Sequence, residues 1–185
     1  MEATSVTAVA QPAGLARKLG ASAYEALLLA ALLLLIEFAL LPMVTPTDRG
    51  PADAMRGASQ PIPYLMSRRA RAASGALLFG VCGAYCIGLW SAGRRTLPMK
   101  TWRIALRGRG GARVSLQAAM LRYFACWIGP ALAIAGYVAV APPWHGRWAL
   151  ALTAVNYAWA FVDRDGQYLQ DRIAGTRLVT VPPGS

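Results

Sequence analysis

Long apolar runs separated by short polar segments dominate the chain. Between Leu19 and Val44, only Glu25 and Glu37 interrupt the first run. A helix needs roughly 20 apolar residues to cross the hydrocarbon core of a bilayer, and this run is long enough. With the three runs that follow, the pattern predicts an all-α membrane protein, a four-transmembrane-helix bundle with spans at about residues 19–44, 72–93, 118–141 and 148–162.

The polar segment between the second and third runs has a different period. Residues 102–107 alternate between large apolar residues and arginine or alanine, and a period of two is typical of a half-buried strand. The glycine-rich residues 107–111 supply a turn, after which residues 113–116 return as a short second strand. The segment therefore predicts a small β-hairpin at the cytoplasmic surface of the membrane.

Two further hypotheses concern strands and helices at this surface. In an amphipathic helix lying on the membrane, Lys100, Arg103 and Arg107 would occupy the polar side. So short a segment does not distinguish that helix from a strand. Residues 176–181 near the C-terminus also alternate, and they predict a third strand beside the hairpin.

The polar termini and loops define the domain organisation. Residues 1–14 are rich in alanine, threonine, glutamine and proline and have no hydrophobic period, which predicts a disordered cytoplasmic tail. A single membrane domain is expected over residues 15–182. Within it, the proline-rich residues 45–71 predict a loop, because proline does not continue a helix.

Individual residues in the third and fourth runs predict local features. Ser115 is a suitable N-cap for the third helix, and Pro130 should bend that helix near the middle of the membrane. Thr153 and Asn156 are polar residues within the fourth run. We expect them to hydrogen bond to a neighbouring helix rather than to a substrate.

Composition and charge favour a membrane protein over a soluble one. Of the 185 residues, 56% are hydrophobic, and the formal net charge is +11. A soluble protein with this charge would suggest nucleic-acid binding, but here the basic residues flank apolar spans, so no nucleic-acid partner is expected. The expected partner is a bilayer with anionic lipid headgroups, contacted by Arg94, Arg95, Lys100, Arg103 and Arg107.

The same basic segment predicts the topology. It contains no acidic residue, and cytoplasmic loops of membrane proteins carry an excess of lysine and arginine. With four spans, this rule places both the N- and C-termini in the cytoplasm.

Few residues have the pattern of a chemical site. A carboxylate within a span costs on the order of 2–3 kcal/mol and normally faces protein or water, so Glu25 is the first candidate. Arg17 precedes it by eight positions, about two helical turns, and therefore lies on nearly the same face. No serine, cysteine or histidine has the partners that catalysis requires, and no cluster of metal ligands is evident. We therefore expect no enzymatic activity, no metal and no cofactor.

Two sequence motifs resemble those of a known family. Residues 170–176 read QDRIAGT and residues 95–100 read RTLPMK. They are similar to the HDRxAGT signature and the RTxGxK segment of the RDD family of bacterial membrane proteins. By this resemblance, Arg17 is the arginine that opens the first helix, Glu25 the acid within it, and Asp171 the aspartate of the closing motif. A location in the bacterial cytoplasmic (inner) membrane, as a multi-pass protein, is implied.

The chain departs from the family pattern at three positions. Glu25 stands where the family usually has aspartate, Gln170 where it has histidine, and Pro98 where it has glycine. Glutamate keeps the negative charge, whereas glutamine does not titrate near neutral pH. A proton or metal role of that histidine is therefore not transferred to this chain.

Two functional hypotheses follow. The resemblance implies transport of a cation or small solute, and an acid within a span suggests proton coupling. A four-span subunit offers little room for a pathway, so this hypothesis predicts a homo-oligomer. Alternatively, the chain is a non-catalytic membrane assembly or partner protein, bound to another membrane protein, in which the charges only stabilise the fold. In both cases the candidate ion, proton or structural network consists of Arg17, Glu25, Asp171 and Arg172.

Overall fold

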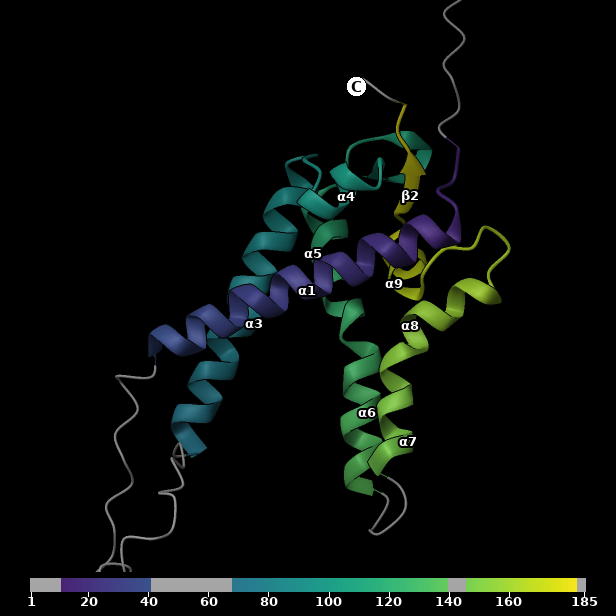
Figure 1. The fold of residues 1–185 in the computed structure, drawn as a ribbon. Helices are drawn as coiled ribbons and strands as arrows, with labels where there is room; N and C mark the ends of the chain where they lie inside the picture. Colours follow the sequence, from purple (N-terminus) through teal and green to yellow (C-terminus); the bar gives the residue numbers. More distant parts are fainter. Residues whose placement is uncertain (1–10, 41–67, 140–145, 183–185) are drawn as a thin grey trace, which may run out of the picture. The chain divides into compact units, whose positions relative to one another are not determined.

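The computed structural model describes residues 11–40, 68–139 and 146–182. Its elements are mostly helical, and Figure 1 shows them in chain order. They are α1 (Leu15–Leu40), α3 (Arg68–Ser91), α4 (Leu97–Thr101), β1 (Ile104–Arg107), η2 (Arg109–Gly111), α5 (Leu116–Cys126), α6 (Ile128–Ala139), α7 (Gly146–Ala151), η3 (Leu152–Ala154), α8 (Val155–Ala158), η4 (Trp159–Phe161), α9 (Leu169–Ala174) and β2 (Arg177–Thr180). The chain divides into two compact units, residues 1–26 with 83–185, and residues 27–82.

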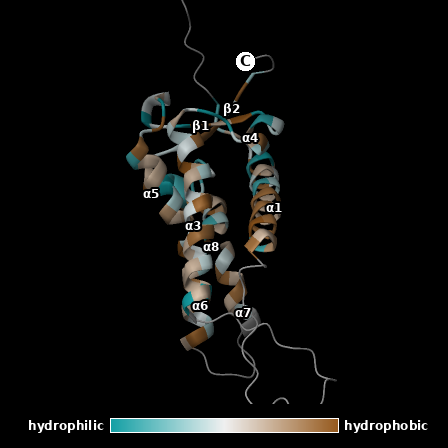
Figure 2. Cartoon of the chain, turned by 90° about the vertical axis from the view of Figure 1, so that its left-hand side faces the viewer, coloured by the Kyte–Doolittle hydropathy of each residue, from teal (hydrophilic) through white to brown (hydrophobic). Residues whose placement is uncertain are grey.

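Three helices in the described part of the chain are long and apolar enough to cross a membrane. They are Leu15–Leu40, Arg69–Ser91 and Leu116–Ala139, the last formed by α5 and α6 together. Most of α1 is coloured as hydrophobic in Figure 2. The expected fourth span is not one continuous helix, because α7, η3, α8 and η4 divide residues 146–161 into short α and 3₁₀ pieces. One break coincides with Thr153, whose Oγ1 donates to the Leu150 carbonyl at 2.6 Å, a bond that often bends helices.

The unit formed by residues 27–82 contains the end of α1 and the start of α3. The second span begins at Arg68 rather than at residue 72, so the end of the expected loop 45–71 is helical, while its residues up to 67 lie outside the described part of the chain. Within this unit the Ser74 hydroxyl donates a hydrogen bond to the Glu37 carboxylate. A polar partner of this kind is what a carboxylate within a span requires.

The third span is interrupted between α5 and α6, three residues before the proline that was expected to bend it. Ser115 caps α5 as predicted, its hydroxyl accepting the Ala118 N–H at 3.2 Å. Pro130 has no N–H to donate to the carbonyl four residues earlier, which is that of Cys126. The Asn156 side chain replaces the missing donor, because its Nδ2 lies 3.0 Å from the Ala125 carbonyl and 2.8 Å from the Cys126 carbonyl. The prediction for Asn156 is thus confirmed.

The segment with Asn156 packs closely against α6. In Figure 1, α6 and α7 run side by side. A Cβ added at Gly129 would lie 2.5 Å from the Thr153 carbonyl oxygen and 3.1 Å from that of Leu152. Only a residue without a side chain permits this backbone approach, which is the usual role of small residues between membrane helices.

The two strands form one antiparallel sheet, in which Ile104 pairs with Thr180 and Arg107 with Arg177. The strand predicted after residue 102 and the one predicted near the C-terminus are therefore confirmed, but the hairpin is wrong. Residues 113–116 do not return as a strand, because Ser115 already caps α5. The alternative of one amphipathic helix is also wrong, since Lys100 lies in α4, Arg107 in β1, and Arg103 between them has φ +52°.

The N-terminal residues 11–13, expected in a disordered tail, are ordered against this sheet. Ala13 N donates to the Leu178 carbonyl at 3.0 Å, and Thr180 N donates to the Gln11 carbonyl at 2.9 Å. Backbone pairing at a strand edge requires no hydrophobic period, which is why the sequence pattern did not indicate it. The preceding part of the tail, residues 1–10, lies outside the described residues.

Candidate functional site

The QDRIAGT motif forms α9 and its C-terminal cap. Asp171 is fully buried, and Gly175 ends the helix with φ +63°, a left-handed conformation that glycine adopts at little cost. The Thr176 N–H then donates to the Asp171 carbonyl at 2.9 Å, and the Thr176 hydroxyl donates to Asp171 Oδ1 at 3.2 Å. The motif thus encodes a helix end that holds one acid in the interior.

Arg122 of α5 is the partner of this buried acid. Its Nη1 forms an ion pair with Asp171 Oδ1 and lies 3.4 Å from the Thr176 hydroxyl. The guanidinium carbon also lies 4.9 Å from the centre of the Trp90 ring, a cation–π arrangement that favours a desolvated arginine. Asp171 is therefore paired across α5 and α9 with a residue that was not part of the expected network.

Glu25 of α1 is half-buried and contacts the second family segment. The Thr96 side chain forms a hydrogen bond with the Glu25 carboxylate, and Arg122 is close enough to act on it electrostatically. Glu25 Oε1 is shielded from solvent and has no hydrogen-bond partner among the described residues. One carboxylate oxygen is thus held in place, and the other is without a donor.

Thr96 forms hydrogen bonds with two elements, α1 through Glu25 and α4 through its first turn. Its hydroxyl oxygen accepts the Met99 N–H at 3.4 Å and so caps α4, in which Pro98 occupies the first turn. Proline is tolerated there because the first amides of a helix have no intrahelical partner. The departure at Pro98 is therefore compatible with the fold of this segment.

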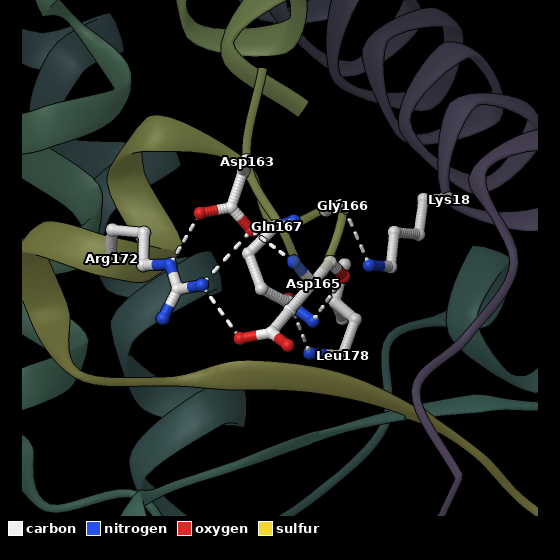
Figure 3. Close-up of polar contacts among 7 residues, drawn as sticks. All are labelled: Lys18, Asp163, Asp165, Gly166, Gln167, Arg172 and Leu178. Atoms are coloured by element: carbon white, nitrogen blue, oxygen red, sulfur yellow. Dashed lines mark hydrogen bonds and ion pairs between the residues drawn. The ribbon is translucent and has the colours of Figure 1, made fainter. Parts of the chain in front are cut away.

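The cation that α1 directs into the protein is Lys18, not Arg17. Lys18 is 1% exposed, and its Nζ donates to the Gly166 carbonyl at 2.8 Å, as Figure 3 shows. The adjacent Arg17 is exposed. Of the two neighbouring basic residues, the one that the family resemblance did not select is thus the internal one.

Arg172 of α9 belongs to a separate cluster, which it forms with two acids of the loop before that helix (Figure 3). Its Nε lies 2.6 Å from Asp163 Oδ1, and its Nη2 lies 2.6 Å from Asp165 Oδ2. The hydrogen bond from Arg172 is the main cause that lowers the pKa of Asp163, and the Gln167 N–H, 2.8 Å from Oδ2, acts in the same direction. The Asp165 N–H also donates to Asp163 Oδ2 at 3.0 Å, and these bonds hold residues 163–166 in a turn. The predicted network is therefore divided between two places.

Tyr168 stands beside this cluster and is fully buried. Its hydroxyl lies 3.4 Å from Ser22 Oγ, and its ring meets that of Tyr157 edge to face with centroids 5.1 Å apart. Burial raises the pKa of Tyr168 to about 12. The phenol is therefore protonated at neutral pH and ties the start of α1 to α9.

Alkaline pH should consequently destabilise this contact. The folded pKa of Tyr168 lies above the ordinary tyrosine value of about 10, so its contribution is complete below pH 10 and is lost as the pH rises through 12. We expect the thermal unfolding midpoint to fall over this range and to fall less in Tyr168→Phe. An equal fall in both proteins would contradict the assignment. An absorbance titration of tyrosinate should show one late-titrating group that the variant lacks.

The basic residues predicted to contact lipid headgroups are mostly at the surface. Arg94, Lys100, Arg103 and Arg107 are exposed, and Arg95 is half-buried. This placement is compatible with headgroup contact, which stays a prediction. Within residues 11–40, 68–139 and 146–182, no three side chains among histidine, cysteine, aspartate and glutamate gather as metal ligands would.

Three residues of the site were not predicted from the sequence. Arg122 was visible as a lone charge in an apolar run, which is itself a signal, because such a charge requires a partner. Thr96 and Lys18 gave weaker signals, since neither a threonine in a polar segment nor one of two adjacent basic residues is unusual. These three residues connect the first helix and the two family segments.

Comparison with known proteins agrees with this arrangement of motifs. A family model described as the RDD family matches residues 12–175. Searches of curated proteins and of solved structures give no significant match. The matched region contains Glu25, the RTLPMK segment, Arg122 and Asp171, and the apolar helices are those of a membrane protein. The chain therefore belongs to the RDD family.

Proposed function

We propose that the protein transports a cation, or a small solute, across the bacterial inner membrane and couples this transport to protons at Glu25. The observation that carries the proposal is the asymmetry of the Glu25 carboxylate. Thr96 holds one side of it, whereas Oε1 is shielded and has no donor among the described residues. A carboxylate with a shielded, unpaired oxygen is a suitable acceptor for a proton or a cation.

The environment of Glu25 supports exchange rather than permanent pairing. Arg122 acts on Glu25 electrostatically, but its Nη1 is already engaged by Asp171. An acid whose nearest cation is already paired with another acid gains or loses a proton at a smaller free-energy cost than an acid in a direct ion pair. In this proposal Arg122 and Asp171 are the fixed charges and Glu25 is the exchanging one.

Cation-driven proton flux tests the proposal. The full chain is reconstituted in liposomes with an internal pH dye, and a Na⁺ or K⁺ gradient is applied. We expect a cation-dependent pH change with wild type and its loss in Glu25→Gln. Glu37→Gln is the matched control, because Glu37 lies on the same helix and pairs with Ser74. Wild-type flux in Glu25→Gln would exclude transport through this residue.

A non-catalytic assembly or partner protein is the second candidate. It is favoured by the Arg122–Asp171 pair, which stabilises α9 against α5 without requiring titration. Purification in mild detergent distinguishes the two candidates. A partner protein in constant ratio and no flux would support assembly, and a homo-oligomer with flux would support transport. Cytoplasmic termini are part of both proposals, and cysteine labelling of the Arg94–Arg113 segment from either side of the membrane tests them.

A further inference from the structure

A polar cavity of about 250 Å³ lies beside α9 and β2, apart from Glu25. Three arginines line it, Arg109 from η2, Arg172 from α9 and Arg177 from β2, together with the acids Asp165 and Asp171. Its volume corresponds to roughly eight water molecules at about 30 Å³ each. The cavity is therefore large enough for a small ionic group.

The acids in its wall already have ion-pair partners, whereas two of the arginines have no acidic partner in the described part of the chain. Asp165 pairs with Arg172, and Asp171 pairs with Arg122. Among the described residues, no acidic group lies within ion-pair distance of Arg109 or Arg177, and both are exposed. The cavity thus carries uncompensated positive charge.

The backbone holds Arg109 at this place. Gly110 and Gly111, with φ of +68° and +84°, turn the chain directly after it. A Cβ added at Gly175 would lie 2.8 Å from Arg109 Nε, so the arginine side chain lies directly over the glycine that ends α9. The last carbonyls of a helix attract a cation. That attraction explains why the Arg109 side chain lies at the end of α9, but it does not explain the position of Arg177.

The sheet adds a like-charge contact next to the cavity. Arg177 is directly opposite Arg107 in the antiparallel register. Residues opposite one another share a face, and like charges in such a pair are destabilising. An anion in the cavity would offset this repulsion from the Arg177 side, and the planar guanidinium donates to phosphate oxygens in pairs.

We propose that this cavity binds a phosphate group through Arg109 and Arg177. The group belongs either to an anionic lipid headgroup or to a soluble phosphate compound, because both offer the same oxygens to the two guanidinium groups. The site does not depend on transport and does not include Glu25. It also differs from the five residues expected to contact lipid headgroups, because none of those five lines the cavity.

The test compares binding of inorganic phosphate and of phosphatidylglycerol by the purified full chain. Phosphate binding is measured as a rise in the thermal unfolding midpoint at constant ionic strength, with chloride as reference. Lipid binding is measured by retention of phosphatidylglycerol over phosphatidylcholine in mixed nanodiscs. Arg109→Gln/Arg177→Gln should weaken binding at least tenfold. Both side chains are exposed, so the fold should survive the change.

Arg71→Gln/Arg164→Gln is the control, because it removes the same charge from exposed positions that neither line the cavity nor belong to the residues expected to contact lipid headgroups. Retention of phosphatidylglycerol alone would assign the site to a headgroup, and stabilisation by inorganic phosphate would assign it to a soluble compound. Arg109→Lys/Arg177→Lys should bind with intermediate strength, because lysine keeps the charge but not the planar fork. Equal binding of both probes by the cavity variant and the control would overturn the proposal.

Discussion

Replacing Arg122 by methionine should greatly reduce the amount of folded protein. The change removes the partner of Asp171, which is fully buried. Leaving one charge of a buried pair uncompensated costs about 3–5 kcal/mol, a large part of the roughly 5–15 kcal/mol that stabilises a typical domain. We expect the monodisperse peak of detergent-purified protein to fall sharply, together with the thermal unfolding midpoint.

Arg172→Met is the matched control for this result. Arg172 lies next to Asp171 in sequence and also pairs with acids, but its side chain is 45% exposed. Exposed ion pairs contribute about 0–1 kcal/mol, so this variant should remain close to wild type. Equal losses in the two variants would mean that burial of the Arg122 pair has no special importance.

Gly129→Ala should also destabilise the protein strongly. Its added methyl group would lie 2.5 Å from the Thr153 carbonyl oxygen and 3.1 Å from that of Leu152, so α6 and the following segment would have to separate. Overpacking of this kind typically costs about 1–3 kcal/mol. Separation would also weaken the hydrogen bonds from Asn156 to Ala125 and Cys126. Unfolding by sodium dodecyl sulfate in mixed micelles would measure the loss.

Gly80→Ala provides the comparison. Gly80 is also helical and within a span, but a Cβ there would meet no atom within 4 Å. Alanine is a better helix former than glycine by about 0.5–1 kcal/mol, so this variant should be as stable as wild type or more stable. Equal stability of Gly129→Ala and Gly80→Ala would show that the close approach at Gly129 is not required.

The apolar helices were predictable because length and hydropathy are local properties. The outcome for the fourth run was not predictable, since 15 mostly apolar residues also fit short helices packed against a neighbour. The strand at β1 was likewise evident from its alternation, but its partner was not. Pairing is non-local, and the alternation at residues 113–116 suited a strand as well as that at residues 176–181.

The site, too, was predicted only where local sequence features identify its residues. Motif resemblance selected Glu25 and Asp171, of which Asp171 is fully buried and Glu25 is half-buried. Their partners Thr96 and Arg122 come from distant segments, so no local spacing could identify them. The choice between Arg17 and Lys18 depends on a rotation of about 100° on one helix. Because α1 is apolar almost all round, the sequence does not say which of its faces meets the protein.

One internal ion pair joins α5 to α9, and a double-mutant cycle of Arg122→Met and Asp171→Leu tests it most directly. The free energy of unfolding is measured for wild type, both single variants and the double variant in mixed micelles. We predict that the double variant recovers most of the stability that Arg122→Met loses, giving a coupling of about 2–3 kcal/mol, because two apolar side chains replace the pair. Additive losses within about 0.5 kcal/mol would contradict a direct partnership between these residues.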